Sequence, residues 1–301
     1  SFLTSAALSI NPSFGDAMVL QSFGGSGGHG AEGYGGGTGG AGGQGGALTV
    51  DTRSGTLTTP GGAGQVRLYT AGGYGGTGGN NTLNKGQPGG GGGSGGNITV
   101  NIDKRLSISD IESGVAAISL QTVGGNGGQG GQGSSSVLAN DGGAGANGGQ
   151  IKITLTDYSP TTPAILPTTP ALVINTIGQQ TPGLEAFSGG GVGGDAGVSG
   201  GKGNGGAGGE GEAIDFYAPG SAVQITTNGS FSRGLSLYNT GANGGKGSDG
   251  TFLKRVPGSG GNAGATEGVN LNLGYLEPKI ENRLAGARST ITTHGTDSAA
   301  I

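Results

Sequence analysis

A pattern of alternating apolar and polar residues that runs into glycines recurs five times along the chain. The first copy is Leu20-Gln-Ser-Phe-Gly-Gly-Ser-Gly-Gly, and the other four begin at Leu68, Leu120, Ala186 and Leu237. Alternation with period two is typical of a half-buried β-strand. Because repeats about 50 residues apart are the mark of solenoid architectures, the pattern predicts a repeating β-structure.

Two more strand-like segments follow each copy of this pattern. The second strands are expected at 47–50, 98–102, 151–155, 214–216 and 269–273, and the third at 57–59, 106–108, 172–174, 223–225 and 290–292. Three short strands in about 25 residues make one coil of a parallel β-helix. The sequence therefore predicts an all-β fold, a right-handed parallel β-helix (β-solenoid) of about five coils with three short strands per coil.

Branched residues at matching positions of the second strands define the expected core. They form one inward column of Ile98, Ile151, Ile214 and Val269, beside a second column of Val100, Ile153, Phe216 and Leu271. One coil cannot bury its apolar face alone, but a stack of coils about 4.8 Å apart can.

Five glycine-rich excursions separate the first strand of each repeat from the second. They cover 24–46, 72–96, 124–149, 189–211 and 241–268, and their non-glycine residues recur at every third position, as do Ser26, His29 and Glu32. Period three matches a helix of the polyproline II type, so each excursion is expected to form two legs joined by a tip. Two glycine columns in a leg imply two buried faces.

The sequence therefore predicts paired polyglycine II helices that protrude from each coil and pack as a two-layer slab. The third column of each leg is expected to face solvent. Glycine-rich tracts are usually flexible linkers, and that alternative is disfavoured here by the phase that all ten legs share.

A proline-rich stretch at 156–171 is expected to form a loop outside the stack, because proline cannot donate to a ladder of strands. The chain begins with Ser1 and ends in what looks like another strand. We therefore expect residues 1–301 to be a single repeat domain that is a fragment of a longer protein.

Composition narrows the class of function. Glycine accounts for 79 of 301 residues but lies in blocks, which excludes collagen. A net charge of -4 offers no argument for nucleic acid or an anionic membrane surface. The chain has no Cys and no run of 18 apolar residues, so we expect neither thiolate chemistry nor a membrane-embedded segment.

Motifs that would carry chemistry are weak. The many Gly-x-Gly-x-x-Gly matches do not open a helix, as a nucleotide site requires. The stretch 244–251 resembles a calcium-binding nonapeptide but occurs once, and His29 and His294 lie near no Cys. The carboxylates share no column position, and solvated surface is the expected role of Asp110, Glu112, Glu185, Asp215 and Glu277. No catalytic residue, cofactor or metal is predicted, and we expect that the chain is not an enzyme.

The tips of the excursions are the better functional candidates, because loops on a rigid scaffold carry recognition. The tips differ in sequence while the legs do not. The residues most able to contact a ligand are Tyr34, Lys85, Phe252, Lys254 and Arg255. The alternative, that the tips vary because nothing constrains them, stays open.

Strands that end in Leu-Gln-Ser/Thr-x-Gly-Gly-x-Gly-Gly, at Leu20 and Leu120, resemble the repeats of large glycine-rich autotransporter passengers of Gram-negative bacteria. So does the stretch 225–235, with Ile225-Thr-Thr-Asn-Gly-Ser leading to Arg233-Gly-Leu. The resemblance covers nearly the whole chain. It implies an extracellular β-helix, attached to the outer membrane through a barrel outside this chain. The implied role is adhesion to a receptor or glycan of a host or neighbouring cell, with lateral self-association possible, and no binding residue is transferred.

Layers of glycine helices also resemble phage tail-fibre tip adhesins, which recognise host receptors with their loops. The regular alternation of legs and coils departs from that pattern. Ice-binding glycine helices favour a flat face of small residues, and Glu32, Tyr74, Asp195 and Lys246 argue against them. The leading hypothesis is a structural or adhesive segment of a bacterial surface protein. A phage receptor-binding adhesin is the alternative, and a β-helix polysaccharide-degrading enzyme is the remote one.

Overall fold

A computed structural model describes most of the chain. The described residues are 2–3, 8–9, 18–52, 57–59, 66–103, 105–111, 114–133, 139–156, 170–198, 202–218, 221–249, 257–273, 289–294 and 296–301. This part of the chain contains strands and no helix, so the expected all-β class is confirmed.

The strands form three parallel sheets. Sheet A contains β1 (Phe2–Leu3), β4 (Leu48–Asp51), β7 (Ile98–Ile102), β10 (Ile151–Leu155), β13 (Ile214–Tyr217) and β16 (Val269–Asn272). Sheet B contains β2 (Leu8–Ser9), β5 (Leu57–Thr59), β8 (Leu106–Ile111), β11 (Leu172–Thr176), β14 (Val223–Thr227) and β17 (Thr290–Thr293). Sheet C contains β3 (Met18–Phe23), β6 (Val66–Ala71), β9 (Ile118–Val123), β12 (Leu184–Gly189) and β15 (Leu235–Thr240).

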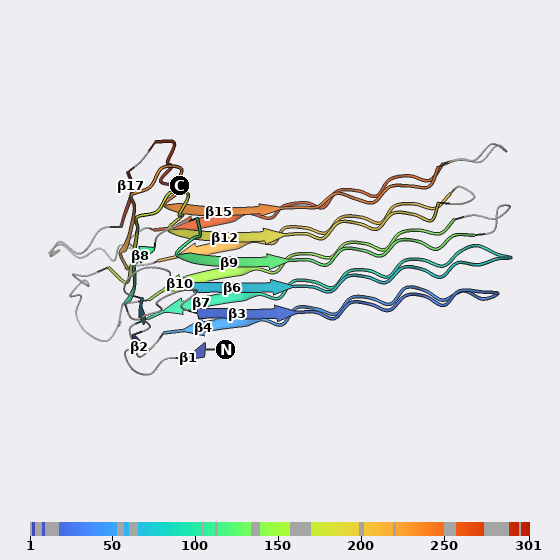
Figure 1. Ribbon diagram of the computed structural model, residues 1–301, viewed down its shortest axis with the longest axis horizontal. Helices are drawn as coiled ribbons and strands as arrows, with labels where there is room; N and C mark the ends of the chain where they lie inside the picture. Colours follow the sequence, from blue (N-terminus) through green and yellow to red (C-terminus); the bar gives the residue numbers. More distant parts are fainter. Residues whose placement is uncertain are drawn as a thin grey trace, which may run out of the picture.

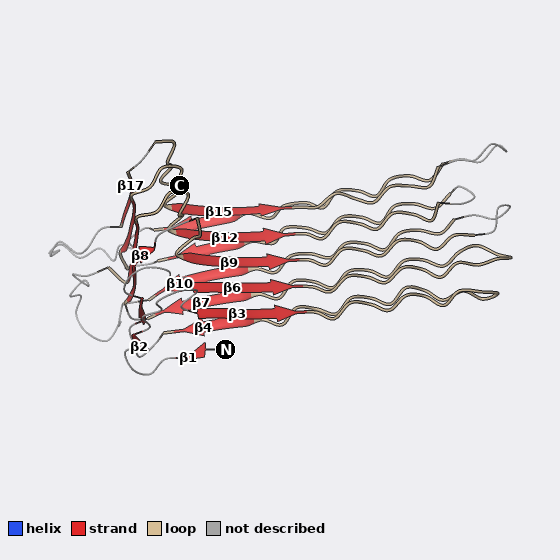
Figure 2. Cartoon of the chain, in the orientation of Figure 1, coloured by secondary structure: helices blue, strands red, loops and turns tan. Residues whose placement is uncertain are grey.

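The chain visits the sheets in a fixed order, from C through a glycine excursion to A, then to B and back to C. Each strand pairs in parallel with the equivalent strand of the previous and next repeat, and this is the arrangement of a β-solenoid. The excursions leave where the strands of sheet C end and return where those of sheet A begin. They extend from the strands side by side and in one direction (Figures 1 and 2).

The predicted core columns are confirmed in the middle of sheet A. Ile151 is in register with Ile98 on one side and Ile214 on the other, and all three side chains are fully buried. Burying such a side chain contributes roughly 1.5–3 kcal/mol. Val269 continues the column in register with Ile214, as predicted, but it is 40% exposed and not buried, because β16 is the last strand of the sheet and has a neighbour on one side alone.

Sheets B and C complete the core with columns of their own. Their buried members are Leu106, Leu172 and Val223; Ile108, Ile174 and Ile225; and Leu68, Leu120 and Ala186. These side chains meet those of sheet A in one hydrophobic cluster. The proline-rich loop predicted at 156–171 falls almost entirely outside the described residues.

The turns that lead from sheet B to sheet C also stack on one another. Backbone N–H groups of Gly114, Gln180 and Phe231 each donate to the following turn. All three residues have positive φ, at 69°, 53° and 57°. Left-handed backbone is ordinary for glycine but costs energy for bulky residues, so the stacking holds the two non-glycine residues in a conformation that they rarely adopt.

Candidate functional surface

The legs of the excursions have a repeating triplet of a first glycine, a second glycine and a variable residue, as in Gly24, Gly25 and Ser26. The outgoing leg follows a strand of sheet C, and the returning leg precedes a strand of sheet A. In the first four excursions, first glycines within the legs donate their N–H groups to the carbonyls of variable residues in the same leg of the next excursion. Examples are Gly75 to Asn126 (2.8 Å) in the outgoing legs and Gly92 to Ala144 (2.9 Å) in the returning legs.

The second glycines bind the outgoing legs to the returning legs. Gly76 donates to Gly40, Gly90 to Gly76, Gly128 to Gly90 and Gly143 to Gly128, each at 2.8 Å. This zigzag crosses between the legs of one excursion and then on to the next excursion. The legs therefore form two hydrogen-bonded rows held against each other, with a period of three residues.

In the middle of the slab, both glycine columns are enforced by steric contact. A Cβ atom added to Gly128 would lie 2.0 Å from the carbonyl oxygen of Gly76, and one added to Gly127 would lie 1.9 Å from that of Gly143. Real Cβ atoms essentially never come within 3.0 Å of such an atom. Alanine does occupy a second-glycine position at Ala146, and its N–H donates a hydrogen bond of 3.0 Å to the Gly125 carbonyl of the neighbouring leg.

Where Asn or Asp stands at a variable position, its side chain can accept the N–H of the variable residue in the next excursion. Asn126 in one outgoing leg accepts, through Oδ1, the N–H of Val192 in the next at 2.8 Å. The same contact joins Asn80 to Gln132, Asn97 to Gln150, Asp141 to Asn204, Asn147 to Glu210, Asp195 to Lys246 and Asn204 to Ser259, at 2.7–3.0 Å. The sequence pattern predicts only that these Asn and Asp residues face solvent. In the structure their side chains also accept the remaining backbone N–H groups of neighbouring legs.

Hydroxyl groups join the legs to the strands. Ser22, Thr70, Thr122 and Ser188 hold the same position of sheet C, and the last three are fully buried. Thr122 donates to the Gly96 carbonyl (3.0 Å) and accepts from the Gly149 N–H (2.7 Å). This column satisfies backbone groups of the returning legs at the point where the period changes from two to three.

The structure brings two of the predicted tips together. Gly33 pairs with Asn81, and the side-chain amide of Gln87 donates to Gly35 at 3.2 Å. Tyr34 on the first tip is 78% exposed, and Lys85 on the second is exposed. Both tips lie at the end of the legs farthest from the strands (Figure 1). Phe252, Lys254 and Arg255 lie outside the described residues.

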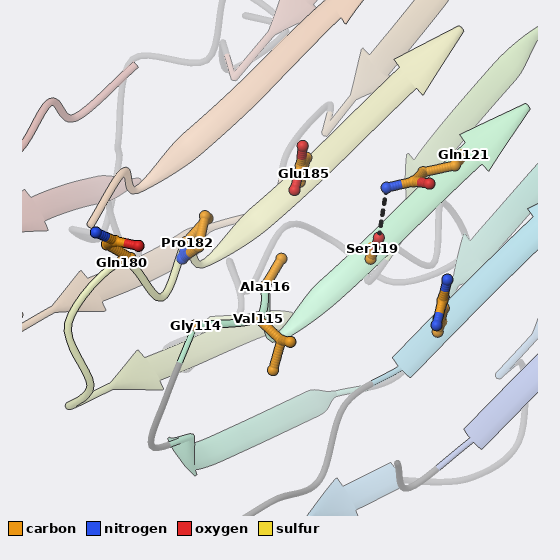
Figure 3. Close-up of a pocket in the computed structure, with 9 residues that line it drawn as sticks. Gly114, Val115, Ala116, Ser119, Gln121, Gln180, Pro182 and Glu185 are labelled. Carbon is orange, nitrogen blue, oxygen red and sulfur yellow. Dashed lines mark hydrogen bonds between the residues drawn. The ribbon is translucent and has the colours of Figure 1, made fainter. Parts of the chain in front are cut away.

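A hollow that sequence analysis did not predict lies on the outer face of sheet C (Figure 3). Its volume is about 360 Å³, and its lining residues are Arg67, Gly114, Val115, Ala116, Ser119, Gln121, Gln180, Pro182 and Glu185. Arg67, Ser119 and Glu185 stand at one register position of β6, β9 and β12. At the adjacent outward position Gln121 donates to Ser119 at 3.4 Å.

A difference in turn length accompanies this hollow. Six residues separate β8 from β9, whereas seven separate β11 from β12 and β14 from β15. The register of β8 against β11 also shifts, so that two residues of β8 stand opposite one of β11, as in a β-bulge. Bulges and shortened turns re-aim the backbone locally, and the described end of the short turn supplies Gly114, Val115 and Ala116 to the rim.

Glu185 was expected to be a solvated surface carboxylate, but in the structure it is hydrogen bonded to another side chain. Its Oε1 accepts the Tyr238 hydroxyl at 2.9 Å, and the Tyr238 ring packs against Phe187 with centroids 4.9 Å apart. Burial and the hydrogen bond to the Glu185 carboxylate raise the pKa of Tyr238 to about 12. Glu185 is therefore held in place at one wall of the hollow.

Among the residues that the structure describes, Glu185 is the one carboxylate that lines this hollow, and neither histidine lines it. Asp215 accepts from the Asn270 amide at 2.7 Å, and the side chains of Asp110, Glu112 and Glu277 lie outside the described part. His29 is hydrogen bonded to Thr77 on the next leg at 2.6 Å. Among the described residues there is no cluster of three or more His, Asp or Glu suited to a metal, and no helix able to span a bilayer.

Comparison with protein-family models, curated proteins and solved structures gave no match to this chain, so the geometry carries the functional argument.

Proposed function

We propose that this chain is a structural and adhesive segment of an exported, cell-surface protein of the autotransporter kind, without a catalytic role. In this proposal the strands form a β-helix of about five coils, right-handed as nearly all parallel crossovers are. The glycine legs are paired polyglycine II helices, which act as a rigid support for loop tips that contact a receptor or glycan.

Hydrogen bonding between the legs is the observation that carries the proposal. Two of the three N–H groups in a triplet donate to neighbouring legs, as those of Gly127 and Gly128 do to Val192 and Gly90. A helix of this type makes no internal hydrogen bonds and must obtain them from its neighbours. The period of three and the exclusion of Cβ atoms support this helix class, since three residues per turn place every glycine of one column on one face.

Rigid legs suit display better than they suit catalysis. Nine residues at about 3.1 Å each give a leg of about 28 Å, which holds the tips well away from the strands. The tips of neighbouring excursions are tied by Gln87 and Gly35, so Tyr34 and Lys85 are presented together. Tyrosine is one of the residue types that contribute most binding energy at interfaces, and a lysine beside it adds a hydrogen-bond donor.

Capture of coated beads tests the role of the tips. The purified chain is coupled to fluorescent beads, and bead capture is measured on printed glycans and on a panel of epithelial and bacterial cells. The Tyr34→Ser/Lys85→Ser variant is expected to lose most of the capture. The matched control is Tyr74→Ser/Lys246→Ser, which removes an exposed tyrosine and lysine from the legs. Equal capture by both variants would show that the tips are not the adhesive surface.

A phage receptor-binding adhesin is the second candidate, and the two packed rows of glycine legs favour it. Gene context separates the two candidates. An outer-membrane barrel domain in the same reading frame supports the surface protein, whereas a neighbouring fibre gene supports the phage adhesin.

A further inference from the structure

The hollow on sheet C carries one formal charge of each sign. Arg67 and Glu185 stand on β6 and β12, with Ser119 of β9 between them. Parallel neighbours are about 4.8 Å apart, so the two charged residues leave the sheet about 10 Å from each other. The remaining lining side chains are neutral. A site with no net charge has no electrostatic preference for a free anion or a free cation.

Polar groups around the hollow both donate and accept hydrogen bonds. Gln121 and Gln180 each offer an amide N–H₂ and a carbonyl oxygen, and Ser119 offers a hydroxyl. The carboxylate of Glu185 accepts, and the guanidinium of Arg67 donates. Hydroxyl groups suit such a mixture, because each hydroxyl donates one hydrogen bond and accepts others.

One side of the hollow is apolar. Val115, Ala116 and Pro182 lie along the edge nearest the turns, opposite Gln121 in Figure 3. A ring with hydroxyls at its edge and C–H groups on its face would satisfy both sides at once. The volume of about 360 Å³ falls within the range of small-molecule sites, roughly 300–1,000 Å³.

The acceptor at the wall is fixed before any ligand arrives. Tyr238 donates to Glu185 at 2.9 Å and is itself packed on Phe187. A side chain that is already held in place loses less rotamer entropy on binding. Gln121 is oriented in the same way, because its amide donates a hydrogen bond to the hydroxyl of Ser119, a residue that is only 4% exposed.

We propose that this hollow binds a neutral polyhydroxylated ligand, namely a sugar ring or a short saccharide. The ring stacks its C–H face on Val115 and Pro182 and directs its hydroxyls to Gln121, Glu185 and Arg67. This site lies on the strands and not on the tips, so it does not depend on the adhesive role of Tyr34 and Lys85.

Calorimetric titration of the full chain tests the proposal. The probes are glucose, galactose, N-acetylglucosamine, cellobiose and lactose, with inorganic phosphate as an anionic comparator and glycine as a zwitterionic one. We expect saturable binding of at least one neutral sugar. Gln121→Ala and Glu185→Gln are expected to weaken it tenfold or more, and Glu185→Gln retains an acceptor for the Tyr238 hydroxyl.

The matched control is Gln21→Ala, which removes an exposed glutamine from the same column as Gln121, two strands away. This variant is expected to bind sugar as the unmodified chain does, and the tip variant Tyr34→Ser/Lys85→Ser likewise. Circular dichroism and urea midpoints establish that each variant is folded. Absence of binding to every neutral sugar, preference for phosphate or glycine, or equal loss in Gln21→Ala would each overturn the proposal.

Discussion

Valine in place of Gly128 is the sharpest test of the packing between the legs. Gly128 is a second glycine in the middle of an outgoing leg, where its N–H donates to Gly90 and its carbonyl accepts from Gly143. A Cβ there would lie 2.0 Å from the Gly76 carbonyl oxygen, against a limit of 3.0 Å. The legs must therefore separate by about 1 Å. Ala146 shows that a second-glycine position can hold one methyl group, so valine, with its larger side chain, is the more decisive change.

The size of the effect follows from the bonds that this separation breaks. Two hydrogen bonds lie next to the new side chain, from the Gly128 N–H to the Gly90 carbonyl and from the Gly90 N–H to the Gly76 carbonyl. Each contributes about 1 kcal/mol of net stability. Overpacking adds about 1–3 kcal/mol. Loss of a flexible glycine from the unfolded chain offsets about 0.4–1 kcal/mol. We expect a net loss of about 3 kcal/mol in the free energy of opening the legs.

Hydrogen exchange measured by mass spectrometry is the suitable assay, because repeat proteins open locally and the legs can separate without loss of the β-helix. A loss of about 3 kcal/mol corresponds to roughly 100-fold faster exchange of the amides in 124–133 and 139–149. Gln129→Val, at the adjacent exposed variable position, is the control and should exchange as the unmodified chain does. Equal exchange in Gly128→Val and Gln129→Val would refute the packing argument.

Two further predictions concern side chains. Asn126→Ala removes the acceptor for the Val192 N–H and is expected to lower leg stability by about 0.5–1.5 kcal/mol, whereas Asn126→Asp keeps it; equal urea midpoints for the two variants would contradict this role. Because the folded-state pKa of Tyr238 is raised from 10 to about 12, its contribution to stability is complete below pH 10 and is lost as pH rises towards 12. Between pH 10 and pH 12, the urea midpoint of the unmodified chain should fall more steeply with pH than that of Tyr238→Phe. An identical pH dependence in the two proteins would show that Tyr238 does not link stability to pH.

Much of the scaffold is readable from the sequence. Branched residues at matching positions, such as Ile98, Ile151 and Ile214, identify a core column because stacked coils require the same face to be apolar in each repeat. The phase of the glycines likewise identifies the legs. The exposure of Val269 was missed because β16 lies at an edge of its sheet, and the pattern of apolar residues does not show which strand of a sheet is the last.

The hollow was missed for a different reason. Arg67, Ser119 and Glu185 each precede the same position of the repeated pattern, so aligning the copies places them in one column. The hollow lies beside the six-residue turn before β9 and the register shift in β8. Such differences of one residue alter backbone direction without any change in hydrophobic pattern. The roles of Asn126 and its counterparts were missed because a polar residue on an exposed face is usually explained by water alone.

The hydrogen bonds between the legs repeat every three residues, so the length of a leg can change without disturbing them only in multiples of three. Adding one residue to a leg would place a side chain where Gly128 or Gly90 now passes its neighbour, whereas adding three residues to both legs of an excursion would keep the glycines in phase with those of the neighbouring legs. On the polyglycine II geometry such an addition moves that tip outward by about 9 Å. The heights of the tips can therefore evolve in whole triplets while the strands beneath them stay unchanged, and the first two tips, which contact each other, would have to change together.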